Sequence, residues 1–452
     1  MTPARQVDLL DVIEAQSARA FEARLMLWIA LAMFVEGYDM QVAGYAAPAI
    51  IHDWGISKAS FGAVFSLGMA GYMFGALALS NLGDRFGRRV LTLGGVFFFG
   101  AVTVGCALAT SPAQMTVLRV AAGIGLGAAI PNVIALAAEY APQRLRATRV
   151  AIAFAFYTVG SAAGGFIAAW MLPRFGWPSL FHAGGWAALL LGVALIFALP
   201  ESARFLVASG RDGERLLSLL RRLSPDLRLP QGTQIIAREE QRQTRSALEL
   251  FRGGLLPTTL LLWSAYICNM VALHFMTSWL PTIIEASGVG LASAAITTGL
   301  FQGGGTAGTL LAGRLLDRRG ILPLALVFVA AVPIVAAVGE VAGSVAVTML
   351  LITLAGVCIP GGQGGINALA GTLYPTAIRA TGAGWALGVG RVGSILGPAL
   401  GALLIALDLP YKALFAFLAI PPLLTALALA GLARTRSVRS GPERGLAAAP
   451  GG

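Results

Sequence analysis

The sequence predicts an all-α membrane protein with twelve transmembrane helices in two related six-helix bundles. Three observations support this fold class: the composition, a series of long apolar segments, and an internal repeat. Of the 452 residues, 57% are hydrophobic and only 12% are charged, whereas a soluble domain carries about 25% charged residues. A chain of this length has room for about twelve spans of roughly 20 residues each. Its 57 glycines suit helices that pack closely within lipid.

Twelve apolar segments follow one another, six on each side of a polar central stretch. They lie near residues 25–51, 61–81, 89–109, 114–139, 148–171, 179–199, 255–285, 292–313, 321–339, 343–372, 380–406 and 410–433. We therefore expect an N-terminal bundle over 25–199 and a C-terminal bundle over 254–433. The polar segments 1–24, 200–253 and 434–452 are expected to lie in the cytoplasm.

The basic residues predict the orientation of these spans. Of the 32 lysines and arginines, 27 lie in the two ends, the central stretch and the loops on the same side. The opposite loops hold only Lys58, Arg174 and Lys412, and the remaining two, Arg119 and Arg391, fall within spans. Because Lys and Arg accumulate in cytoplasmic loops, both termini are predicted to be cytoplasmic. The same rule explains the net charge of +11 without a nucleic-acid partner.

The two halves of the chain are copies of each other. A shift of 233 residues, without a gap, aligns identical residues over about a hundred positions. Among these pairs are Gly71 with Gly304, Gly75 with Gly308, Asp84 with Asp317, Gly87 with Gly320, Pro142 with Pro375 and Arg146 with Arg379. Repeats of this kind are typical of transporters whose bundles rock about a shared cavity near the membrane midplane. We therefore expect alternating access.

The loop motifs resemble those of the major facilitator superfamily. SNLGDRFGRR at residues 80–89 resembles its loop signature, with Ser80 for a Gly and Gly83 for an Ala, and GRLLDRRG at 313–320 is a second copy. RVAAGIGLGAAIPN at 119–132 and PESARF at 200–205 resemble further motifs of the superfamily. The resemblance implies a latch that stabilises one access state, and Glu139 is expected to pair with Arg144 or Arg146. The latch and gate residues are Asp84, Arg85, Gly87, Arg88, Arg119, Glu139, Arg144, Arg146, Asp317, Arg318 and Arg379.

Three further segments resemble the aromatic acid:proton symporter family. They are EGYDMQ at 36–41, where Glu36 replaces the usual Asp, SWLPTII at 278–284, and the long stretch 361–398. The resemblance implies proton-coupled import of small aromatic carboxylates, of the hydroxybenzoate or hydroxyphenylpropionate type, across a bacterial inner membrane. The alternative is a proton-driven multidrug transporter or another organic-anion transporter of the same superfamily.

Two carboxylates lie inside the first predicted span. Glu36 is near the midplane and Asp39 is on the same helical face. Charged groups are costly there and usually serve a function, so we expect proton coupling, with a static pair as the alternative. Arg391 either binds the substrate carboxylate through two parallel bonds or neutralises these acids. Arg119 is expected to serve proton coupling or helix packing.

A cavity for an aromatic acid needs apolar walls and a few polar tips. The candidates to line it are Tyr38, Tyr45, Asn132, His274, Trp279, Gln302, Gln363, Asn367 and Trp385. Each of these alone is more often a packing residue than a ligand. Asn269 occupies the repeat position of Glu36, so the acidic function is expected in one half only.

The sequence indicates neither a resident cofactor nor an enzyme. Three cysteines lie in apolar runs and three histidines are scattered without ligand spacing, so we expect no disulfide, metal or cofactor. No nucleophile–base set, phosphate loop or signalling domain supports a membrane enzyme or a sensor. The expected partners are the aromatic carboxylate, protons and membrane lipids, and the protein is expected to be a monomer.

Overall fold

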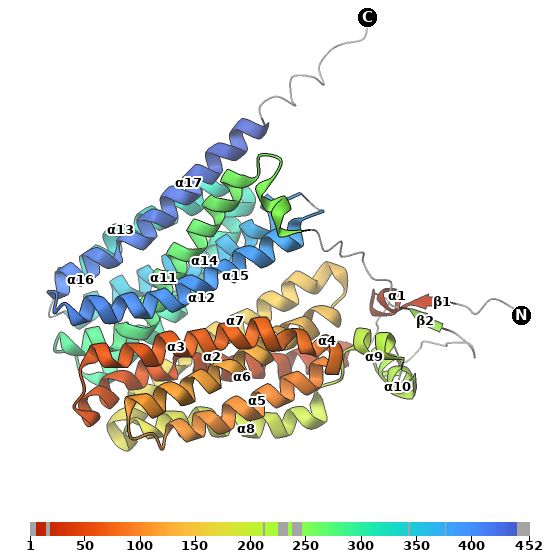
Figure 1. Cartoon of the computed structure of the whole chain (residues 1–452), viewed down its shortest axis with the longest axis horizontal. Helices are drawn as coiled ribbons and strands as arrows, with labels where there is room; N and C mark the ends of the chain where they lie inside the picture. Colours follow the sequence, from red (N-terminus) through yellow and green to blue (C-terminus); the bar gives the residue numbers. More distant parts are fainter. Residues whose placement is uncertain are drawn as a thin grey trace, which may run out of the picture. The chain divides into compact units, whose positions relative to one another are not determined.

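The structure, a computed structural model, describes residues 6–14, 19–210, 213–224, 234–236, 246–341, 344–375 and 377–440. Almost all of them are helical (Figure 1). The long helices are α2 (Arg19–Trp54), α5 (Arg88–Cys106), α6 (Pro112–Glu139), α7 (Gln143–Phe175), α8 (Pro178–Ala198), α11 (Leu256–Ala286), α12 (Leu291–Arg319), α13 (Ile321–Val338), α14 (Val345–Leu373), α15 (Arg379–Ala406) and α17 (Ile420–Ser440). The short α16 (Tyr411–Leu418) leads into α17.

The second helical stretch, Lys58–Phe86, is composite. It consists of η1 (Lys58–Phe61), α3 (Gly62–Phe74), the π-helical η2 (Gly75–Leu79), η3 (Ser80–Leu82) and α4 (Gly83–Phe86). The corresponding stretch of the second half, α12, is an uninterrupted α-helix. A single π turn is often associated with a functional site, and here it directly precedes the loop motif.

Within the described residues, ten helical stretches are long and apolar enough to cross a membrane. Helices α2 and α12 are as long, but charged residues in α2 and glycines and threonines in α12 lower their hydropathy. Together they make the twelve expected spans, so the predicted fold class is confirmed. Several helices extend a few residues beyond the predicted apolar segments, since a helix need not end where the hydrocarbon does.

The helix bounds follow the repeat that the sequence predicts. The 233-residue shift moves 58–86 onto 291–319, which are the bounds of α12, and moves the start of α5 onto the start of α13. It also moves the start of α6 onto Val345, the first residue of α14. Gly87 and Gly320 both have positive φ, 100° and 75°, a conformation that favours glycine. The two halves therefore share one backbone plan.

The chain forms two compact units. Unit 1 comprises Met1–Val42, Leu67–Gly164 and Phe175–Arg242, and unit 2 comprises Ala43–Ser66, Gly165–Arg174 and Gln243–Gly452. The ends of α2, α3 and α7 thus belong with the second half of the chain. In unit 2, the ring of Phe65 meets Trp279 edge-on at 5.2 Å.

Small residues bring the helices of each unit close together. In unit 2, α12 packs on α14 through four glycines, where an added Cβ would meet the backbone of the other helix. These are Gly304, Gly308, Gly356 and Gly361. In unit 1, Gly71 and Gly127 do the same between the Lys58–Phe86 stretch and α6. Lipid is as apolar as the helix surfaces, so no hydrophobic driving force holds the helices together. Close packing of their backbones through small residues stabilises their association instead.

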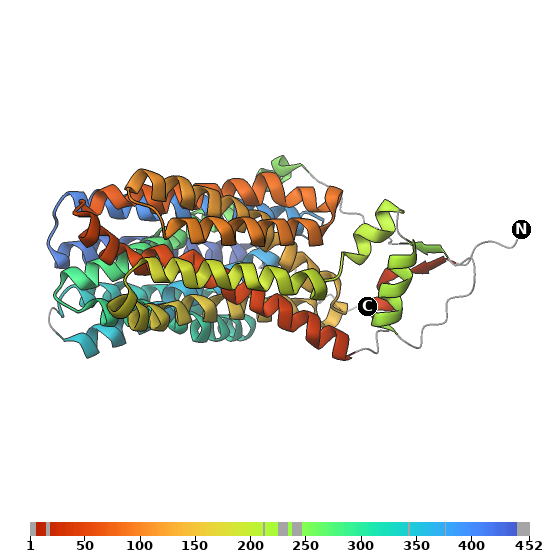
Figure 2. The same ribbon diagram turned by 90° about the horizontal axis from the view of Figure 1, so that it is seen from below.

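Residues before the first span join the central stretch in a loop module, which we define as β1, α1, α9, α10 and β2. Strand β1 (Gln6–Asp8) pairs in parallel with β2 (Gln234–Ile236). Helix α1 (Leu9–Glu14) packs on the leucine face of α10 (Gly213–Leu223), and α9 (Ala203–Ser209) completes the module. Figures 1 and 2 show these elements together at one end of unit 1. The predicted polar segments thus include folded parts, while 1–5, 15–18 and much of 225–245 lie outside the described residues.

Candidate functional site

The acidic residues of α2 lie in the interior of unit 1. Asp39 is fully buried and accepts a hydrogen bond from Thr103 Oγ1 on α5 at 2.7 Å. Arg119 on α6 forms an ion pair with the Asp39 carboxylate at 3.2 Å and also donates to the Asp39 backbone carbonyl at 3.1 Å. Three helices thus converge on one carboxylate. Arg119, one of the two arginines predicted within spans, is the cation of this ion pair.

The second repeat carries apolar residues at the places of this ion pair. The 233-residue shift moves Asp39, Thr103 and Arg119 onto Ala272, Ala336 and Ile352, and both Ala272 and Ile352 are fully buried. A buried ion pair costs much desolvation, and well-packed apolar residues are often as stable in its place. The repeat therefore indicates that the shared backbone plan does not require the pair, so a task specific to the first half is favoured for it.

Glu36 is buried one helical turn before Asp39 and has no such partner. It is 1% exposed, and neither carboxylate oxygen has a hydrogen-bond partner within the described part of the chain. The helix stays continuous at Gly37, where α7 presses against α2 and Ser161 donates to the Gly37 carbonyl at 2.9 Å. A buried carboxylate without a donor or cation is disfavoured in its charged form.

Arg391 belongs to α15 in unit 2. The glycines beside it, Gly390 and Gly393, pack on α11, where an added Cβ would meet the ring of Tyr266 and the backbone of Ile267. These glycines therefore allow close packing of α15 on α11. Arg391 as a whole residue is half-buried.

An amide network links α11 and α14 in unit 2. Asn367 Oδ1 accepts from the Tyr266 hydroxyl and from Gln363 Nε2, each at 2.9 Å. Gln363 Oε1 in turn accepts from Asn269 Nδ2 at 2.7 Å. The structure therefore brings together two predicted lining residues, Gln363 and Asn367, with two that the sequence did not single out as ligands. In the sequence, the available signal was the spacing of Tyr266 and Asn269, which are three residues apart and therefore share one helical face.

The polar tips of several other predicted lining residues are already bonded to backbone. The Tyr38 hydroxyl donates to the Leu180 carbonyl and Trp279 Nε1 to the Pro398 carbonyl, both at 2.9 Å. His274 Nδ1 lies 3.0 Å from the carbonyl of Met270 on its own helix. These contacts are typical of packing residues.

The remaining lining candidates differ in exposure. Tyr45 is buried, and Gln302 is buried with its Oε1 unpartnered within the described residues. Trp385 is 48% exposed and stacks on Trp263 at 6.2 Å. Trp385 is therefore not enclosed as a cavity wall in unit 2.

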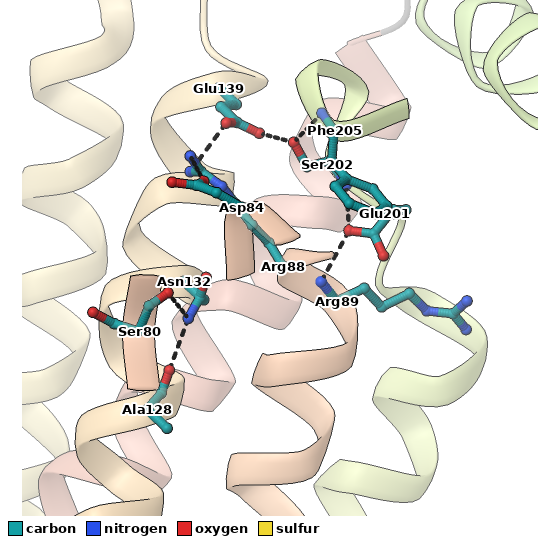
Figure 3. A network of polar contacts seen from close by, with 10 residues as sticks. All are labelled: Ser80, Asp84, Arg88, Arg89, Ala128, Asn132, Glu139, Glu201, Ser202 and Phe205. Atoms are coloured by element: carbon teal, nitrogen blue, oxygen red, sulfur yellow. Dashed lines mark hydrogen bonds and ion pairs between the residues drawn. The ribbon is translucent and has the colours of Figure 1, made fainter. Parts of the chain in front are cut away.

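The loop motif forms a charged cluster in unit 1 (Figure 3). Arg88 lies 3.2 Å from Asp84 and 3.0 Å from Glu139 at the end of α6. The Ser202 hydroxyl donates to Glu139 at 2.6 Å and caps the first turn of α9 by accepting from Phe205 N–H at 3.1 Å. The expectation that Glu139 pairs with Arg144 or Arg146 is therefore wrong, because Arg88 from the motif is the cation that reaches it.

Glu201, from the PESARF segment, links this cluster to the start of α5. Its carboxylate accepts from the backbone N–H of Arg89 at 3.0 Å, in the first turn of α5, where the helix dipole favours a negative charge. Its backbone carbonyl accepts from the Tyr140 hydroxyl, and the Arg89 side chain donates to the Ile196 carbonyl. Two motifs far apart in sequence thus form one charged network.

Asn132 lies beside this network and serves the loop motif. Its Nδ2 donates to the carbonyls of Ala128 at 2.8 Å and Ser80 at 3.4 Å (Figure 3). Its Oδ1 fills the space where a Cβ on Gly83 would lie. Ser80 and Gly83 are the two residues of this motif that depart from the superfamily signature. Both of them contact the Asn132 amide. The prediction that Asn132 lines a substrate cavity has no support in these contacts.

The other predicted gate residues lie at helix ends. Arg85 packs over the ring of Phe86 at 5.4 Å, and Arg379 Nε donates to the Tyr374 carbonyl at 3.4 Å. Arg144 and Arg318 are exposed and Arg146 is half-buried. The side chain of Asp317 lies outside the described residues.

Twelve spans in two repeats, with buried charges on α2 and a charged cluster at the loop motif, define a membrane transporter. Residues 29–392 match the Major Facilitator Superfamily, and the chain belongs to it, as its motifs predict.

Two curated relatives match nearly the whole chain. The 4-hydroxybenzoate transporter PcaK of Pseudomonas aeruginosa is 38% identical, over 94% of this chain and 96% of that protein. The gallate transporter of Pseudomonas putida is 36% identical, over 95% and 96%. Among solved structures, a D-xylose-proton symporter has the same fold, with a TM-score of 0.69, 18% identity, and coverage of 90% of this chain and 97% of that one.

Replacing Arg119 by Ile, the residue of the second repeat, should destabilise unit 1 by about 3–5 kcal/mol, because Asp39 then stays buried and unpaired. Adding Asp39→Ala and Thr103→Ala should restore most of that loss. Denaturation of the purified protein in detergent measures both. A triple variant no more stable than Arg119→Ile would show that the apolar arrangement of the second repeat cannot replace the pair.

Gly83→Ala should destabilise the loop motif by about 1–3 kcal/mol, since its methyl group overlaps the Asn132 amide. In an Asn132→Ala background the same change should cost little. The double-mutant cycle, followed by denaturation in detergent, isolates the coupling. Equal costs in both backgrounds would mean that Asn132 does not set the need for glycine.

Proposed function

We propose that this protein imports small aromatic carboxylates, of the hydroxybenzoate or hydroxyphenylpropionate type, together with protons. The names of the two curated relatives support this substrate class. The observation that carries the proton coupling is Glu36, a buried carboxylate on the first helix without a partner in unit 1. A packing role does not explain a carboxylate in that environment, because a neutral residue would be less costly there.

Glu36 is the proton carrier in this proposal. Burial of the protonated acid costs much less than burial of the carboxylate anion, so the buried position of Glu36 suits the neutral acid. Ionisation requires water or a cation, so release of the proton is tied to opening of the site to one side of the membrane. Asp39 differs, since Arg119 and Thr103 stabilise its charge. The two acids thus have separate tasks, with Asp39 and Arg119 holding the helices that position Glu36.

Arg391 is the anchor for the substrate carboxylate. A guanidinium presents donors in a planar fork that matches a carboxylate and stays charged at every relevant pH. The close packing of Gly390 and Gly393 on α11 fixes the part of α15 that carries Arg391. A neutral ring without a carboxylate would gain nothing from this charge, which favours aromatic acids over uncharged drugs.

The charged network of the loop motif acts as the latch of the transport cycle. Arg88 joins the motif to Glu139, and Glu201 joins the start of α5 to the segment after α8. These bonds stabilise one arrangement of the helix ends, and their exchange accompanies the change of access. The other basic residues of the loops meet phospholipid headgroups: Arg85, Arg144 and Arg146 in unit 1, and Arg318 and Arg379 in unit 2.

The same proposal gives the setting of the protein. It is a monomer in the bacterial inner membrane with both termini in the cytoplasm, as the distribution of basic residues supports. The substrate crosses unchanged, so no enzymatic step is involved.

Glu36→Gln should abolish accumulation of a radiolabelled aromatic acid driven by an inward proton gradient, while exchange of labelled for unlabelled substrate without a gradient continues. Uptake into membrane vesicles measures both. Glu340→Gln is the matched control, because this carboxylate is exposed and pairs with Lys412 at 2.8 Å. Gradient-driven uptake by Glu36→Gln at the rate of the unaltered protein would exclude Glu36 as the proton carrier.

Arg391→Ala should weaken binding of the acid by about ten- to a hundredfold, as expected for loss of a charged hydrogen bond worth about 1.5–3 kcal/mol. Binding of the corresponding neutral amide should change little. Titration of the purified protein with 4-hydroxybenzoate and 4-hydroxybenzamide measures the difference. An equal loss for acid and amide would contradict the role of Arg391 as carboxylate anchor.

A further inference from the structure

We propose that Asn269 selects aromatic acids that carry a ring hydroxyl, because its side-chain oxygen accepts the hydrogen bond of that hydroxyl. This inference rests on the proposed function and adds a specificity-determining residue to it. Asn269 lies in the middle of α11 and is fully buried.

The orientation of the Asn269 amide follows from its partners. Its Nδ2 donates to the backbone carbonyl of Ile359 at 3.2 Å and to Gln363 Oε1 at 2.7 Å. The Ile359 carbonyl can only accept, so the group that faces it must be the nitrogen. Asn269 Oδ1 therefore points elsewhere, and it has no hydrogen-bond partner among the described residues.

The surrounding network fixes this oxygen in place. Gln363 bonds at both ends of its amide, to Asn269 and to Asn367, and the Tyr266 hydroxyl donates to Asn367. These side chains hold one another across α11 and α14, and the arrangement ends in a single buried acceptor at Asn269. A buried polar atom without a partner costs free energy, and a fixed acceptor of this kind favours a ligand that brings a donor.

The repeat supports a ligand role for this position. The 233-residue shift places Asn269 on Glu36, so the equivalent points of the two halves each carry a buried side-chain oxygen that has no donor among the described residues. They differ in charge. A second carboxylate would repel an anionic substrate, whereas a neutral amide accepts a hydrogen bond without that repulsion. One half thus provides an oxygen for a proton and the other an oxygen for a hydroxyl group.

The consequence is a preference for phenols over their ethers and over unsubstituted rings. A neutral hydrogen bond contributes about 0.5–1.5 kcal/mol net, which corresponds to about a two- to twelvefold difference in affinity. A methyl ether keeps the oxygen but has no hydrogen to donate, and it adds a methyl group where the acceptor lies. Both effects lower its affinity relative to the phenol.

The test compares three ligands: whichever of 3- and 4-hydroxybenzoate binds more tightly, its methyl ether, and benzoate. Isothermal titration of the purified full-length protein in detergent gives the affinities. We expect the unaltered protein to prefer the phenol by about two- to twelvefold, and Asn269→Leu to bind all three alike, with benzoate affinity retained. The matched control is Thr425→Val, because this buried hydroxyl bonds to the Pro421 carbonyl of its own helix, and it should keep the preference.

Two results overturn the inference alone: a folded Asn269→Leu protein that still prefers the phenol, or an unaltered protein that binds the phenol and its ether equally. The second result requires no variant, so the inference can fail even if Asn269→Leu does not fold. If the unaltered protein binds and transports none of the aromatic acids, the proposed function itself fails, and the inference fails with it.

Discussion

The low dielectric constant of the membrane interior is the constraint on which the polar side chains of this protein depend. A charge there needs an opposite charge, several donors, or a proton. Asp39 has the first two, from Arg119 and Thr103. Glu36, one turn away, has neither within unit 1. Two carboxylates on one helical face therefore differ in their surroundings, and in our proposal this difference separates a permanent charge from a transferable proton.

The two repeats show how one backbone plan supports two chemistries. Helix bounds coincide after a constant shift, yet the ion pair of the first half is replaced by Ala272, Ala336 and Ile352 in the second. The second half instead has an amide network that ends at Asn269. Packing between small residues recurs in both halves, whereas the ion pair and the amide network do not. The two halves therefore share their helix arrangement but differ in the charged side chains buried within it.

Much of the fold can be predicted from the sequence, because hydropathy and the repeat are patterns that extend over twenty or more residues and therefore identify whole spans. The site does not follow so directly. The α2 acids are evident as charges in an apolar segment, but the partner of Asp39 lies 80 residues away and depends on how three helices meet. Glu139 joins Arg88 for the same reason. Asn269 carries no charge or motif. The repeat places it opposite Glu36, but its unpartnered oxygen becomes evident only in the folded unit.

The pairing of β1 with β2 also constrains how the chain crosses the membrane. These strands are joined by hydrogen bonds although six spans separate them in sequence. Segments bonded to each other must be on one side of the bilayer, which requires an even number of crossings between them. The first strand also emerges from the ribosome long before its partner. The first repeat must therefore be inserted, with its topology already settled, before the earliest residues of the protein can complete their own fold.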